Sequence, residues 1–148
     1  MKRIILTTAV IAALAAPAAA MAGTSLDASG KLGAAKGTDF SIRFKVITQN
    51  NKPIGVDNFK VRNVSGECDQ GPALLSFNLN ADPGTFPVSN RGRFNAQGSN
   101  GSTSVQVKGK FKNRHKVKGR VRAEGEFEEQ GGGTLTNCLA TRDYTAGN

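Results

Sequence analysis

Tryptophan is absent from this chain of 148 residues, which has one tyrosine and one histidine. Without tryptophan the chain lacks the buried marker residue of true immunoglobulin domains and the flat ring on which proteins usually hold a sugar. The eight phenylalanines predict a core of phenylalanine and aliphatic side chains instead. The length suits one ordinary domain and excludes large multidomain enzymes.

Catalytic sequence motifs are absent too: there is no nucleophile elbow, zinc-protease motif, phosphate loop or dinucleotide fingerprint. We interpret His115 as a solvated loop residue. Glu124, Glu126 and Glu128 stand two residues apart, which places neighbouring carboxylates roughly 7 Å apart on one strand face, near the spacing in inverting glycosidases. Without a ring to hold a sugar, we interpret them as a solvated acidic face. We expect no enzyme, metal or cofactor, and a secreted hydrolase stays an open alternative.

The first residues predict an export signal. Met1-Lys2-Arg3 is a cationic start, residues 4–16 are apolar, and Ala20-Met21-Ala22 has the small-x-small pattern of a cleavage site. The sequence therefore predicts a signal peptide over 1–22, cut after Ala22 or two residues earlier. The apolar run is shorter than the ~20 residues that a membrane-spanning helix needs, and no second apolar span follows. We expect a secreted or cell-surface protein without a transmembrane segment after cleavage.

Only two cysteines, Cys68 and Cys138, are present. An even number in an exported chain favours a disulfide, which the chain-entropy model values at roughly 4 kcal/mol for a loop of this length. A zinc site would need more ligands than two cysteines and His115 supply. A catalytic thiol would need His115 and an orienting third group, for which no pattern is recognisable.

A period of two dominates the rest of the chain. Residues 23–37 are small and polar and predict a flexible leader that could add a short edge strand. After them, apolar and polar residues alternate within 40–46, 59–68, 75–79, 86–88, 91–97, 102–112, 116–128 and 133–146, and no segment has helical spacing. The domain over 38–148 is therefore predicted to be all-β: an antiparallel β-sandwich of the Ig-like or jelly-roll kind, with about six to eight strands and one disulfide. A small closed barrel is the alternative.

The clearest element is a hairpin made by 102–112 and 116–128, joined at Asn113-Arg114-His115. Its valines and phenylalanines alternate with charged residues, so that a slip of one residue would bury the charges. The register that fits this loop places Phe111 opposite Val117, and Val107 opposite Val121.

The order of these motifs resembles a family of small exported β-sandwich proteins common in actinobacteria, generally described as uncharacterised. The resemblance is carried by F-x-I-x-F-x-V at 40–46, N-F-K-V-R-N-V at 58–64, Cys68, V-x-V-x-G-x-F at 105–111, V-x-G-x-V at 117–121 and G-T-L-T-N-C at 133–138. Relatives often carry tryptophan where this chain has Tyr144. The resemblance implies export, the β-sandwich and the disulfide, and it brings no active site.

The hairpin also carries the strongest functional signal. The formal net charge is +9, and removing the signal peptide lowers it to about +7. Cations alternate along the outward side of the hairpin at Lys108, Lys110, Lys112, Lys116, Lys118, Arg120 and Arg122. The predicted register sets Lys112 opposite Lys116, Lys110 opposite Lys118 and Lys108 opposite Arg120. Like charges facing each other across a ladder are destabilising by ~0.2–1 kcal/mol per pair.

Such a patch attracts polyanions by releasing their counterions. Outside a cell the candidate partners are an anionic cell-wall polymer, an acidic polysaccharide or an anionic lipid surface. Two other interpretations stay open. The lysines could serve solubility and block strand addition, or the protein could be an adhesion or partner-recognition domain that uses its sheet edges or loops.

Overall fold

A computed structural model describes residues 2–10, 22–31, 39–129 and 131–147, with side chains from residue 40 onward. This part of the chain is all-β and contains no helix, as the alternation predicts. The strands are β1 (Lys2–Val10), β2 (Ala22–Lys31), β3 (Asp39–Gln49), β4 (Lys52–Cys68), β5 (Gly71–Ala81), β6 (Phe86–Pro87), β7 (Arg93–Asn100), β8 (Thr103–Asn113), β9 (Lys116–Glu128) and β10 (Thr134–Gly147).

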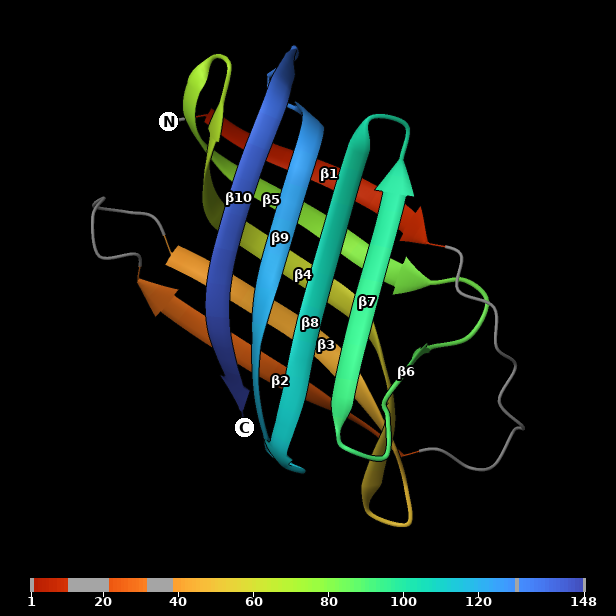
Figure 1. The fold of residues 1–148 in the computed structure, drawn as a ribbon. Coiled ribbons are helices and arrows are strands. Elements are labelled where there is room, and N and C mark those ends of the chain that lie inside the picture. Colours follow the sequence, from red (N-terminus) through yellow and green to blue (C-terminus); the bar gives the residue numbers. More distant parts are fainter. Residues whose placement is uncertain (1, 11–21, 32–38, 130, 148) are drawn as a thin grey trace.

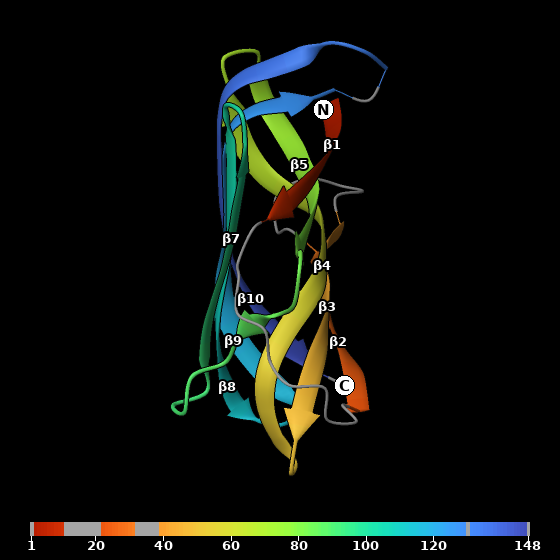
Figure 2. The same ribbon diagram turned by 90° about the vertical axis from the view of Figure 1, so that its right-hand side faces the viewer.

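The strands form one sheet that curls until its two halves face each other. Its order is β1-β5-β4-β3-β2-β10-β9-β8-β7, with β6 paired to β4. In Figure 1 the layer of β7 to β10 lies in front of β1 to β5 and crosses it, and Figure 2 shows the two layers from the side. The pairings are antiparallel apart from β1 with β5. The predicted antiparallel all-β fold is confirmed.

The N-terminal segments contribute to this sheet. Lys2–Val10, part of the predicted signal peptide, forms β1 and pairs in parallel with β5. Ala22–Lys31, which overlaps the predicted leader 23–37, forms β2 and pairs with β3, so the sheet begins before the predicted boundary at residue 38. Ala20 and Met21 of the predicted cleavage site lie outside the described residues, and the signal peptide stays a prediction.

The core lies between the two layers and consists of phenylalanine and aliphatic side chains, as the composition predicts. Phe44 of β3 and Phe59 of β4 are fully buried, and their ring centroids are 5.0 Å apart. Phe94 of β7 reaches across from the other layer and lies 5.9 and 6.0 Å from these two rings. Aromatic contacts at such distances add to the burial of apolar area and fix the two layers against each other.

Asparagines mark the places where the sheet turns or bends. Asn50 and Asn51 both have positive φ and join β3 to β4 in a two-residue turn. Asn58, Asn63 and Asn137 also have positive φ, and each lies where a strand shifts register against its neighbour. Asparagine adopts this conformation more readily than most residues, and bulges increase strand twist. These bulges let the long β4 follow the curl.

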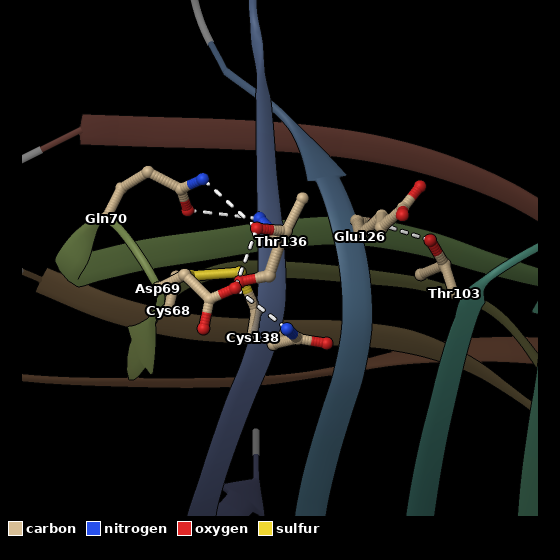
Figure 3. Close-up of a disulfide and its surroundings, with 8 residues drawn as sticks. Cys68, Asp69, Gln70, Thr103, Glu126, Thr136 and Cys138 are labelled. Atoms are coloured by element: carbon tan, nitrogen blue, oxygen red, sulfur yellow. Dashed lines mark hydrogen bonds between the residues drawn. A yellow bond between two sulfur atoms is a disulfide. The ribbon is translucent and has the colours of Figure 1, made fainter.

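The disulfide between Cys68 and Cys138 joins the two layers where β4 ends, confirming the predicted pair. Here β4 also pairs with β10, and Gly66 lies so close that a Cβ would be 2.6 Å from the Cβ of Ala140. Figure 3 shows the polar contacts beside the disulfide. Asp69 accepts hydrogen bonds from the hydroxyl of Thr136 (3.0 Å) and the side-chain amide of Asn137 (2.7 Å). Gln70 accepts one from the Thr136 backbone N–H (3.0 Å).

Candidate functional site

The hairpin of β8 and β9 has the predicted register from Phe111 and Val117 onward, away from its turn. Phe111 pairs with Val117 and Val107 with Val121, and all four side chains lie on the core side. Lys110 therefore lies opposite Lys118, and Lys108 opposite Arg120. Because side chains alternate along a strand, these four cations all project from the outer surface of the β7 to β10 layer.

One predicted pair is wrong. Lys116 pairs with Asn113 rather than with Lys112, because a register shift follows Phe111. The side-chain oxygen of Asn113 accepts a hydrogen bond from the backbone N–H of His115 (2.9 Å), so the chain turns one residue later than predicted. The loop contains only Arg114 and His115, and Lys112 becomes the extra residue of a bulge. Lys112 and Lys116 are both exposed at this end of the hairpin.

The neighbouring strands extend the face. On β7, Arg93 pairs with Lys110 and Asn95 with Lys108, and on β10 Asp143 pairs with Arg120. Arg93 is a cation that the sequence reasoning missed. Its alternation with the buried Phe94 shows that it faces outward, but only the pairing of β7 with β8 places it beside the hairpin lysines.

Two of the seven predicted cations form ion pairs within the protein. Arg120 donates from Nε and Nη2 to the two carboxylate oxygens of Asp143, at 2.6 and 3.2 Å. This hydrogen bonding lowers the pKa of Asp143 and raises the pKa of Arg120. Arg122 pairs with Glu124 at 2.6 Å. Both pairs are exposed, so their contribution to stability is small.

The five lysines of the face remain uncompensated. Lys108, Lys110, Lys112, Lys116 and Lys118 are exposed, and within the described part of the chain none of them forms an ion pair or a side-chain hydrogen bond. Together with Arg93 they form the surface that we call the basic face. Its charge is available to an external anion, whereas the charges of Arg120 and Arg122 are partly satisfied.

Beneath the basic face, one row of residues has an unusual composition. Phe94, Gly109, Gly119 and Tyr144 pair in succession across β7, β8, β9 and β10. The two rings lie on the core side, where the glycines have no side chain, and the Tyr144 hydroxyl donates a hydrogen bond to the Lys108 carbonyl (3.0 Å). On the outer side, above the glycines, lies an open depression of about 460 Å³.

Two rows of charged side chains border this depression. One row holds Arg93, Lys110 and Lys118, and the other holds Lys108, Arg120 and Asp143. Residues two apart on a strand are separated by about 7 Å, so the rows stand that far apart. The depression is thus enclosed by five cations and one carboxylate.

The acidic residues Glu124, Glu126 and Glu128 do not gather into a site. Within the part of the chain that the structure describes, no three His, Cys, Asp or Glu side chains come close enough to hold a metal ion. A second depression, of about 450 Å³, is lined by Pro87, Val88, Ser89, Arg93, Phe94 and Asn95. Among its described lining residues there is no carboxylate, thiol or imidazole that could act as a general base.

The fold defines the class: a disulfide-bonded all-β protein. The disulfide is compatible with a location outside the cytoplasm. Among the described residues no helix has the length and apolar character to cross a membrane. The chain matches no protein-family model, no curated protein and no solved structure. The resemblance to exported actinobacterial proteins therefore stays a prediction.

Proposed function

We propose that this is an exported, non-enzymatic protein that binds anionic polymers at the cell surface through its basic face. The observation that supports this is the set of five exposed lysines that have no partner among the described residues, two of which, Lys110 and Lys118, face each other across the hairpin. Such an arrangement opposes folding slightly, and an anion that lies between the two ammonium groups removes the repulsion. Counterion release from the polymer adds to the binding free energy.

The shape of the face favours a linear polymer over a lipid surface. The lysines follow one another along the part of β8 and β9 next to the hairpin turn, so an extended chain of anionic groups can contact them in succession. Proteins that lie on membranes usually combine cations with exposed apolar side chains. Among the described residues Leu139 is the only exposed large hydrophobic side chain. We therefore propose an anionic cell-wall polymer or an acidic polysaccharide as the partner class.

Retention on immobilised heparin over a series of salt concentrations tests the proposal. The double variant Lys110→Gln/Lys118→Gln removes two facing cations and leaves the core untouched. The slope of log affinity against log salt should decrease by about 0.7–0.9 for each lost contact, and thus by about 1.5 in total. Relief of repulsion should leave the variant as stable as the parent, or more stable by a few tenths of a kcal/mol (~0.2–0.5).

A matched control is Lys45→Gln/Lys60→Gln, which removes the same charge from exposed positions on β3 and β4 in the other layer. Equal losses in both double variants would mean that the net charge alone sets retention, and that no face is used. Unchanged retention in both would mean that the lysines serve solubility. Stronger binding to anionic lipid vesicles than to heparin would overturn the choice of a polymer.

A further inference from the structure

The depression above Gly109 and Gly119 differs from the rest of the basic face because cations border it on two sides. Arg93, Lys110 and Lys118 form one row, and Lys108 and Arg120 stand across from them. Charge-assisted hydrogen bonds between nitrogen and oxygen are about 2.7–2.9 Å long. Rows about 7 Å apart thus leave room for one small oxyanion that touches both.

The protein already holds one oxyanion at this place. The Asp143 carboxylate engages Arg120 with both oxygens, and among the side chains that the structure describes it is the only carboxylate that borders the depression. This fork-to-fork contact is the geometry in which arginine binds carboxylates and phosphates. An external anion that uses Arg120 has to displace Asp143 or bind beside its negative charge.

We propose that the depression is a subsite for one phosphate or sulfate group of the bound polymer, and that Asp143 is an internal competitor that lowers its affinity. This inference rests on the proposed function. A tetrahedral phosphate or sulfate directs oxygens toward both rows at once, whereas a planar carboxylate has two oxygens on one side. The subsite thus prefers phosphorylated or sulfated polymers to polymers that carry only carboxylates.

The test is Asp143→Asn, which keeps the shape of the side chain and removes its charge. Its matched control is Glu124→Gln, which also adds one unit of net charge and also frees an arginine, Arg122, but lies outside the depression. The probe is inorganic pyrophosphate, titrated while the backbone amide signals of the full exported protein are followed by NMR.

We expect Asp143→Asn to bind pyrophosphate about threefold to tenfold more tightly than the parent, the change expected for removing one unit charge several ångströms away near the surface. The largest signal shifts should occur at Gly109 and Gly119. Glu124→Gln should change the affinity less than twofold. The affinity gained by Asp143→Asn should be larger for polyphosphate and heparin than for polyglutamate, which carries only carboxylates. Comparing polyphosphate with heparin then distinguishes phosphate from sulfate as the preferred group.

Equal gains for Asp143→Asn and Glu124→Gln, or signal shifts spread evenly over the basic face, would overturn the subsite and leave polymer binding by the face intact. If Asp143→Asn gained as much affinity for polyglutamate as for heparin, the preference for tetrahedral groups would be overturned. The proposed function itself fails separately, when the loss of Lys110 and Lys118 leaves retention and its salt slope unchanged.

Discussion

Replacing Gly119 by alanine tests the row of aromatic residues and glycines beneath the basic face. A Cβ at this position would lie 2.7 Å from both the Cζ and the hydroxyl oxygen of Tyr144, and it would press against the carbonyl oxygen of Lys108. That carbonyl accepts the Tyr144 hydrogen bond, so one added methyl group strains the backbone of β8 and displaces the bond.

The expected loss of stability combines three contributions. Overpacking a filled core costs about 1–3 kcal/mol, and losing the Tyr144 hydrogen bond costs about 1 kcal/mol more. Alanine offsets about 0.5–1 kcal/mol of this because it restricts the unfolded chain. We expect Gly119→Ala to lower the free energy of unfolding by about 2 kcal/mol, measured by urea denaturation followed by circular dichroism.

Gly109→Ala is the matched comparison. Its Cβ would meet the Phe94 ring, with Cε1 at 2.5 Å, and the Tyr144 hydroxyl at 2.8 Å, but no backbone atom is among its nearest contacts. Phe94→Leu should therefore recover part of the stability lost in Gly109→Ala and none of that lost in Gly119→Ala. A stable Gly119→Ala protein, or equal rescue of both variants by Phe94→Leu, would refute the description of this row.

Three further predictions concern single measurements. Burial raises the pKa of Tyr144, the only tyrosine, so its phenol should stay protonated in the folded protein as the pH passes about 10. Only the unfolded chain then loses the proton, so stability should fall as the pH rises above that value, phenolate absorbance should appear together with unfolding, and Tyr144→Phe should lose this dependence. Replacing Cys68 and Cys138 by serine should lower the free energy of unfolding by about 4 kcal/mol, and the intact parent should weigh two hydrogens less than its reduced form. Sequencing of the exported protein should begin at Gly23 or Met21, and an intact residue 1 in a membrane pellet would contradict a cleaved signal.

Much of the basic face could be predicted from the sequence because a strand has a period of two. The alternation of Val107, Gly109 and Phe111 with lysines determines which side chains face solvent, and the short loop leaves one register that keeps the charges out of the core. The pairs of Lys110 with Lys118 and of Lys108 with Arg120 follow from these local rules. They need no information about the rest of the chain.

The bulge at Lys112 shows where local rules stop. The hydrogen bond from the His115 N–H to the Asn113 side chain moves the turn by one residue, and alternation does not encode which residue near a turn is left unpaired. Alternation likewise does not encode the bulges at Asn58, Asn63 and Asn137, which bend β4 and β10 around the core. A strand pattern identifies their segments without showing the bends.

By itself the sequence determined most strands after residue 39, the core side of each, the hairpin register from Phe111 toward Val107 and the pairing of the only two cysteines, because these depend on local alternation or on a choice without alternatives. Only the tertiary structure decided which strands lie beside the hairpin. It placed Arg93 next to Lys110 and paired Arg120 with the Asp143 carboxylate, although Arg120 and Asp143 are 23 positions apart in the chain. The order of strands in a sheet depends on how the whole core packs, and so the depression between the two charged rows exists only in the folded protein.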